Sequence, residues 1–344
     1  MNGRSLWVLA LRNAPLLLFA IIFLTFGTLS ERFLELQSFE NIVKQASFIG
    51  IVAIGMTFVM LTGGIDLSVG TNMYLSAVVA GLLMQELDAS PWIAFVACIA
   101  VGLAFGAVNA FMIVRLRMVP FIVTLGTLVA GRGLALLITE SRGVILPSEM
   151  LRFGSGDLFG VPNPILVFVV VAIVAQVVLV RTRLGRHVYA VGFDDKSARK
   201  AGIGVDRTLA TAYLVCGACA ALGGFVSVSQ LGIVNPGFGE FTELYAIAAA
   251  VLGGASLFGG VGTVLPGTVL GAILIQMVQS GLVFLRVDIY VQPLVQAAII
   301  FLAVLLDSVR NSTLRNLDRR KIRVEPTAAR STASTRSRAD PPTR

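Results

Sequence analysis

The chain has 344 residues, of which 56% are hydrophobic and 13% are charged, and its formal net charge is +8. A soluble domain of ordinary composition carries about 25% charged residues, so this composition excludes a typical soluble protein and indicates an integral membrane protein. The positive charge does not indicate nucleic-acid binding. The basic residues lie at the ends of apolar segments and in the C-terminal tail, as in loops that face anionic lipid.

Apolar segments close to the ~20 residues that cross a bilayer recur along the chain, and in lipid such segments must be helical. The sequence therefore predicts an all-α polytopic membrane protein with about ten transmembrane helices. Their expected ranges are 14–30, 47–63, 68–85, 91–114, 119–138, 164–181, 208–228, 244–256, 262–284 and 290–308. The eighth range is short, which indicates a broken helix.

The distribution of Lys and Arg predicts the orientation of these helices. If both termini are cytoplasmic, the inner segments hold 21 basic residues and the outer segments hold five. The opposite orientation would place most of the basic charge outside. Residues 1–310 are thus expected to form the transmembrane domain. Residues 311–344, rich in Arg, Ser, Thr and Pro, are expected to be a disordered cytoplasmic tail at the lipid surface.

A glycine-rich turn separates the second and third expected helices, with the sequence Gly63-Gly64-Ile65-Asp66-Leu67-Ser68. Gly63 and Gly64 suit a helix C-cap and a sharp turn, and Asp66 is placed to cap the next helix. An acidic residue within a membrane region is also a candidate for contact with a solute or an ion. Both roles remain open for Asp66.

A second turn, between the eighth and ninth expected helices, has a similar pattern. There Gly253-Gly254 is followed by one residue, then by Ser256 and a leucine, as Gly63-Gly64 is followed by one residue, Asp66 and a leucine. The similarity suggests an internal repeat, and transporters often place interrupted helices of repeats near their solute site. The predicted topology puts both turns on the same side, so they do not by themselves indicate an inverted repeat.

Arg132 lies about twelve residues into the fifth expected helix, roughly 18 Å along it. A charge at that depth must face the interior of the bundle or a water-filled cavity, where Arg132 either lines the solute path or ties helices together. Other polar residues in the expected helices either line a hydrophilic path or bond between helices. They are Asn72, Asn109, Thr124, Thr127, Gln176, Gln276, Gln279, Gln292 and Gln296.

The cytoplasmic loop at 181–207 contains a pattern typical of a short helix. Asp194 or Asp195 can cap its start, Arg199 and Lys200 fall in its last turn, and Gly202 ends it. Such a helix is too short to be stable alone in water, so its own membrane domain or a partner protein must support it.

Several chemistries have no counterpart in the sequence. There is no phosphate-binding G-x-x-x-x-G-K-[ST] loop, and no soluble segment is long enough for a nucleotide-binding domain. His, Cys, Asp and Glu do not cluster at catalytic or metal-binding spacings. We therefore expect no enzymatic activity, metal or cofactor in this chain. If ATP drives transport, another chain binds it.

Four segments carry a resemblance to a known family. They are GIVAIGMTFVMLTGGIDLSVG at 50–70, PFIVTLGTLVAGRG at 120–133, the segment 189–203, and ELYAIAAAVLGGASLFGGVGTVLPG at 243–267. Together the sequence resembles the ribose, xylose and galactose-type permeases of bacterial ABC sugar importers, which fall within the branched-chain amino acid permease superfamily.

The resemblance implies a permease that moves a monosaccharide across the bacterial inner membrane. It also implies a second permease chain, a partner ATPase and an extracytoplasmic sugar-binding protein. Residues 192–203 would be the coupling helix that docks on the ATPase, with Gly192, Asp194, Asp195, Ala198, Arg199 and Gly202 as its marker residues. The usual Gly-Gly-Asn opening is here Gly192-Phe193-Asp194, and Asp can cap a helix as Asn does.

Other transport functions stay open at this point. The related permeases carry solutes such as branched-chain amino acids, autoinducer-type molecules or nucleosides. A self-contained secondary transporter would need an ion-coupling site, for which Asp66 and Arg132 are the obvious intramembrane charges.

Overall fold

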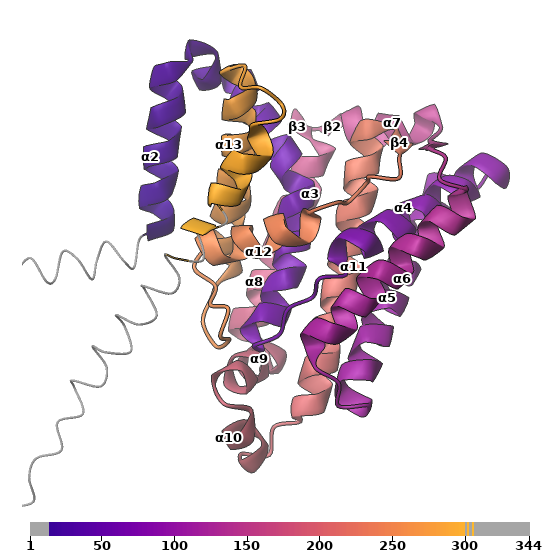
Figure 1. Ribbon diagram of the computed structural model, residues 1–344, viewed down its shortest axis with the longest axis vertical. Coiled ribbons are helices and arrows are strands. Elements are labelled where there is room, and N and C mark those ends of the chain that lie inside the picture. The colour runs from indigo at the N-terminus through magenta and orange to yellow at the C-terminus, as the bar shows by residue number, and fades with distance from the viewer. Residues whose placement is uncertain (1–13, 300, 303–304, 306–344) are drawn as a thin grey trace, which may run out of the picture.

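The computed structural model describes residues 14–299, 301–302 and 305, and most of these residues are helical (Figure 1). The α-helices are α2 (Ala14–Leu29), α3 (Leu36–Leu61), α4 (Val69–Glu86), α5 (Pro91–Ala110), α6 (Pro120–Thr139), α7 (Ser148–Ser155), α8 (Asn163–Arg181), α9 (Arg183–Phe193), α10 (Asp195–Lys200), α11 (Val205–Leu231), α12 (Thr242–Leu252) and α13 (Val269–Phe284). Shorter turns are the 3₁₀ turn η1 (Glu31–Leu34) and the π-helical turns η2 (Phe111–Arg115) and η3 (Val264–Thr268).

Six of the described helical segments are long and apolar enough to cross a membrane. They are Leu36–Leu61, Pro91–Arg115, Pro120–Thr139, Asn163–Arg181, Val205–Leu231 and Val264–Phe284. The expected all-α membrane fold is thereby confirmed, whereas the count of about ten spans stays a prediction. Proline occupies the first turn of α5, α6 and α8, where its missing N–H costs no intrahelical bond.

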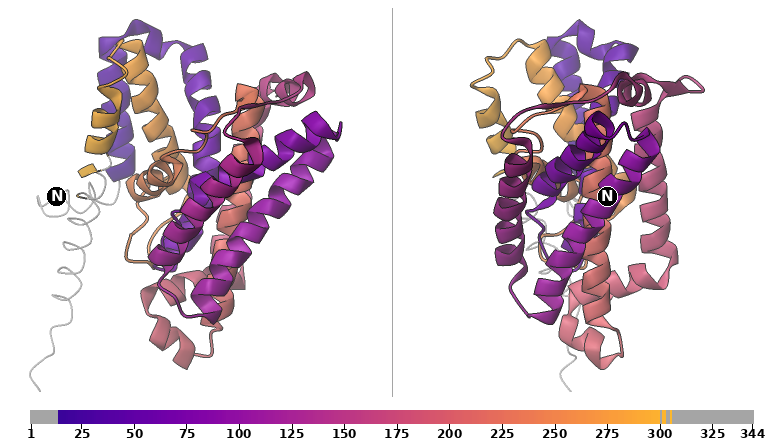
Figure 2. Two further views of the ribbon diagram at one scale, coloured as in Figure 1. Left: turned by 45° about the vertical axis from the view of Figure 1, so that its right-hand side comes forward. Right: turned by 90° about the vertical axis from the view of Figure 1, so that its right-hand side faces the viewer.

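The helices α3 and α11 form the centre of the bundle. Figures 1 and 2 show α2 and α13 at one edge, α4, α5 and α6 at the other, and α9 and α10 at one end. Glycines let the backbones of α11 and α5 approach closely. A Cβ atom added at Gly217 of α11 would clash with the backbone oxygen of Gly102 of α5, at a distance of 2.3 Å. Such contacts are typical of membrane helices, which associate through backbone approach rather than hydrophobic burial.

The largest error in the predicted helices is the start of the second one, which was expected at residue 47. Helix α3 begins at Leu36. Polar residues such as Glu40, Asn41 and Lys44 interrupt the apolar pattern there, which is why the sequence did not predict a helix. In the structure, Asn41 and Lys44 line the polar cavities described below, so a helix can carry them. The eighth expected helix is broken as predicted: α12 ends at Leu252 and is followed by a loop before η3.

Connections on the end opposite α10 contain four two-residue strands that the sequence did not predict. β1 (Val144–Ile145) pairs antiparallel with β4 (Ile233–Val234), and β2 (Asp157–Leu158) pairs with β3 (Val161–Pro162). Both predicted cytoplasmic termini and the predicted tail at 311–344 lie outside the described residues. The expected last helix is described only in part, with residues 292–299 helical.

Candidate functional site

The first glycine-rich turn ends α3 as the sequence predicts. Gly63 has a φ of 80°, its N–H donates to the oxygen of Met60, and the N–H of Gly64 donates to the oxygen of Val59. This is the hydrogen-bond pattern of a Schellman C-cap, with Thr62 as the C-cap residue. The turn therefore stops α3 sharply and sends the chain back into the bundle.

Asp66 makes the predicted capping bond at the start of α4, although the regular helix begins two residues later than this bond implies, with Ser68 as its N-cap residue. Its Oδ1 accepts from the N–H of Ser68 at 2.9 Å and from the Ser68 hydroxyl at 2.5 Å. Ser256 makes the corresponding local bond in the second turn, where its Oγ accepts from the N–H of Phe258 at 3.1 Å. The similarity of the two turns thus extends to this bond, while an internal repeat stays a prediction.

A buried chain of hydrogen bonds links the first turn to α5 and α6. Thr127 donates to Asn109 Oδ1 at 2.8 Å, and Asn109 Nδ2 donates to Ser68 Oγ at 2.8 Å. Asp66, at the end of this chain, is 2% exposed and has no ion-pair partner among the described residues. The sequence-predicted residues Asp66, Ser68 and Thr127 therefore meet in one packed network that joins elements.

Arg132 faces inward, as expected, and ties α6 to the loop before α12. Its guanidinium donates to the backbone oxygens of Pro236 at 2.7 Å and Phe238 at 3.2 Å, and it lies 3.5 Å from a carboxylate oxygen of Glu240. It also sits 5.2 Å from the centre of the Tyr74 ring. Bonds to fixed carbonyls compensate the cost of placing this charge inside the protein, so Arg132 holds elements together here.

The second turn packs against the first at the end of the molecule that carries α10. Gly253 lies against Gly267 closely enough that an added Cβ would be 2.4 Å from the backbone, and Gly254 has a φ of 95°. The N–H of Gly260 donates to the oxygen of Leu61, the last residue of α3, at 2.9 Å.

The end of α9 closes the same contact. A Cβ added at Gly192 would lie 1.7 Å from the oxygen of Leu61 and 2.6 Å from the nitrogen of Gly260. One added at Gly259 would lie 2.7 Å from the oxygen of Gly192 and 2.9 Å from the nitrogen of Gly63. We call these five residues, Leu61, Gly63, Gly192, Gly259 and Gly260, the glycine junction. Three predicted functional segments therefore meet backbone to backbone.

The predicted short helix in the loop 181–207 is α10. Asp194 caps it by accepting from the backbone N–H groups of Lys196 and Ser197 at 2.9 and 3.1 Å, and Gly202 follows it with a φ of 81°. The hydrogen bond from the Ser197 N–H holds the pKa of Asp194 below its ordinary value. The sequence did not show that α9 precedes α10, which makes the loop a helix pair.

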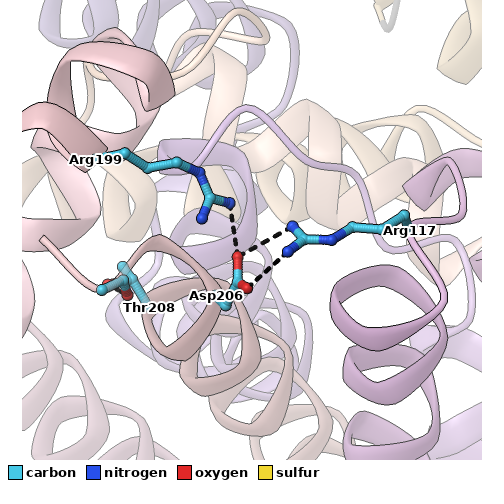
Figure 3. Close-up of polar contacts among 5 residues, drawn as sticks. Arg117, Arg199, Asp206 and Thr208 are labelled. Carbon is cyan, nitrogen blue, oxygen red and sulfur yellow. Dashed lines mark hydrogen bonds and ion pairs between the residues drawn. The ribbon is translucent and has the colours of Figure 1, made fainter.

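Apolar and ionic contacts fix α10 to the membrane domain. Ala198 is buried with Val191 and Val205. Figure 3 shows Asp206, in the first turn of α11, between two arginines. Its carboxylate oxygens lie 2.6 Å from Arg199 of α10 and 3.0 Å from Arg117 of the segment between η2 and α6. Asp206 and Arg117 were not among the residues expected to be functional.

A polar cavity of about 490 Å³ lies between α3, α12, α13 and the helical residues 292–299. We call it the amide cavity. Its lining residues are Ser38, Asn41, Ile42, Gln45, Tyr245, Gln276, Gln279, Ser280, Val283, Phe284, Gln292 and Gln296. None of them is charged, and its volume falls within the roughly 300–1,000 Å³ of small-molecule sites.

A neighbouring cavity of about 510 Å³ shares Asn41 and Gln45 with the amide cavity. Its other lining residues come from α3, α7 and the end of α11, and they include Lys44, Ser227, Ser229 and Gln230. Both cavities lie along the first half of α3, whereas residues 49–61 of that helix are all buried. Polar space therefore opens at the end of the molecule opposite the glycine junction.

Comparison with known proteins places this arrangement in a family. The family model described as the permease component of the branched-chain amino acid transport system matches residues 38–304. The chain belongs to this family. No solved structure gives a significant match.

Several curated relatives are similar to this permease over most of their length. The ribose import permease protein RbsC of Escherichia coli K12 is 38% identical over 300 residues, which cover 86% of this chain and 92% of that protein. RbsC of Bacillus subtilis 168 is 38% identical, with 87% and 93% covered. The fructose import permease protein FrcC of Rhizobium meliloti is 33% identical, with 85% and 84% covered.

The polar residues named from the sequence separate into two groups in the permease. Asn72, Thr124 and Gln176 bond to backbone of other elements, and Asn109 and Thr127 belong to the buried chain. The glutamines at 276, 279, 292 and 296 all line the amide cavity. Ser38, Asn41 and Gln45 were missed because the expected helix began after them, although their i, i+3, i+7 spacing is the signal of one helix face.

Proposed function

We propose that the chain is the membrane-spanning permease of an ATP-binding cassette importer that moves a monosaccharide into the cell across the bacterial inner membrane. The observation that carries this proposal is the glycine junction. It connects the capped helix pair α9–α10, at one end of the molecule, to the turns that end α3 and α12. A partner that displaces α10 would therefore also displace the helices that line the cavities.

The ATPase in this proposal is a partner chain that binds ATP, and a second permease chain and an extracytoplasmic sugar-binding protein complete the importer. About ten spans with both termini in the cytoplasm place α9 and α10 inside the cell and the cavities toward the outside. The permease needs no tight solute binding. It needs outward- and inward-open states whose relative stability the ATPase changes.

The similarity to permeases that import ribose and fructose supports a sugar as the solute. The uncharged lining of the amide cavity favours a neutral solute over a branched-chain amino acid, whose charged groups would lose hydration there without a partner. A secondary transporter gains no support, because Asp66 and Arg132 line neither polar cavity.

Co-purification tests the assembly. The tagged chain is extracted from its native membranes in mild detergent, and the associated proteins are identified by mass spectrometry. We expect an ATP-binding cassette protein to co-purify with the wild type and to be lost when residues 192–203 are replaced by a flexible linker. The control is Phe159→Ser, at an exposed turn between β2 and β3, which should keep the partner. A linker variant that inserts normally and retains the ATPase would refute the coupling role.

A further inference from the structure

We propose that the amide cavity holds the solute during transport and selects neutral polyhydroxylated molecules over charged ones. The proposal rests on the proposed function in one respect, that the chain is a permease. It goes further in assigning the solute to a defined set of side chains, among which Asn41 and Gln279 contact it directly.

The cavity is built from polar faces of three helical segments. On α3 the lining residues Ser38, Asn41 and Gln45 repeat at helical spacing, and on α13 Gln276, Gln279 and Ser280 do the same. The third face is formed by Gln292 and Gln296 of the helical residues 292–299. Polar side chains are expensive in a membrane helix unless they meet a partner or water. Polar faces from three segments that line one cavity therefore indicate a hydrophilic space between the helices.

Hydrogen bonds within the lining position some of these groups and leave others available. Gln276, 4% exposed, donates to Gln45 Oε1 at 2.9 Å, and the hydroxyl of Tyr245 donates to Gln296 Oε1. The side chains of Asn41 and Gln279 line the same cavity but form no hydrogen bond with any other described residue. The first set is held by the protein, whereas Asn41 and Gln279 can turn their amides to a ligand.

The chemistry of the lining identifies the ligand class. A carboxamide offers both donors and an acceptor, and so does each hydroxyl of a sugar, so the two groups satisfy each other in either orientation. A carboxylate, phosphate or ammonium in this cavity would meet no opposite charge among the described lining residues. The lost hydration of such a charge would remain uncompensated, which excludes charged derivatives.

The first test measures uptake into proteoliposomes that contain the permease with its ATPase and sugar-binding protein. Ribose is the neutral probe and ribose 5-phosphate the charged one. We expect the wild type to take up ribose only. Gln279→Leu, which keeps the side-chain size but removes the amide, should lower ribose uptake about tenfold. The control Gln85→Leu changes an exposed glutamine on α4 and should leave uptake unchanged.

The second test does not depend on turnover. Gln279→Cys in the assembled importer is treated with a water-soluble thiol reagent, against a wild type whose own cysteines lie elsewhere, at 98, 216 and 219. We expect labelling of the new thiol, and slower labelling in the presence of ribose and the binding protein. An unlabelled thiol, or ribose uptake by Gln279→Leu at the wild-type rate, overturns the assignment. Absence of ATP-dependent uptake in the wild type would instead refute the proposed function.

Discussion

Asp206 forms a single ionic contact that joins α10 to two neighbouring segments. It bridges Arg199 of α10 and Arg117 of the segment before α6, so three segments share one ionic contact (Figure 3). Its side chain is 37% exposed, and ion pairs at such positions contribute little to overall stability. The contact instead joins α10 to the start of α11, so we expect it to affect how firmly α10 is held.

Replacement of Asp206 by Asn should loosen α10 without unfolding the permease. Loss of two partly exposed ion pairs should lower the free energy of local opening of α10 by roughly 1 kcal/mol. Hydrogen exchange at the amides of α10 should therefore be about fivefold faster. Exchange measured by mass spectrometry, together with ATPase stimulation by the binding protein, checks this. High salt should shrink the difference from wild type.

The control for this experiment is Asp195→Asn, because Asp195 begins α10 but forms no ion pair with a described residue. Equal effects of the two variants would mean that only net charge matters and that the Asp206 bridge does not hold α10.

At the scale of elements, the permease depends on backbone contacts that only glycine permits. The glycine junction brings the end of α9 against the end of α3 with no room for a side chain. The sequence predicted each of these turns separately, because Gly-Gly pairs and capping residues are local signals. It could not predict that they meet, because the contact joins segments far apart in the chain and depends on how the helices pack.

Gly192→Ala should separate this junction. The new Cβ would lie 1.7 Å from the oxygen of Leu61, and since both are backbone-bound, the segments must move apart at a cost of roughly 1–3 kcal/mol. We expect normal membrane insertion, a lower melting temperature and strongly reduced ATP-driven uptake.

Gly126→Ala provides the matched comparison. Gly126 lies within α6 and an added Cβ meets nothing within 4 Å, so its replacement should be neutral or slightly stabilising. If Gly192→Ala behaved like Gly126→Ala in melting and in uptake, the close contact at the junction would have no functional importance.

At the scale of the whole molecule, polar space and tight packing occupy opposite ends of α3. Its first half lines two cavities, while residues 49–61 are buried and end in the glycine junction. Composition and the recurrence of apolar segments sufficed to predict the membrane fold. The amide cavity could not be assembled from the sequence, because its faces come from helices that are adjacent only in the folded bundle, and one of those faces lay in a segment expected to be a loop.

The most direct test of the whole account is the energy source of uptake. Ribose uptake is measured in proteoliposomes that contain the permease, its ATPase and its binding protein, with ATP or a non-hydrolysable analogue supplied to the ATPase side and with ion gradients present or dissipated. We predict uptake that requires ATP hydrolysis and is unchanged when the ion gradients collapse. Uptake by the permease alone that continues without the ATPase and stops when ion gradients are dissipated would contradict the account.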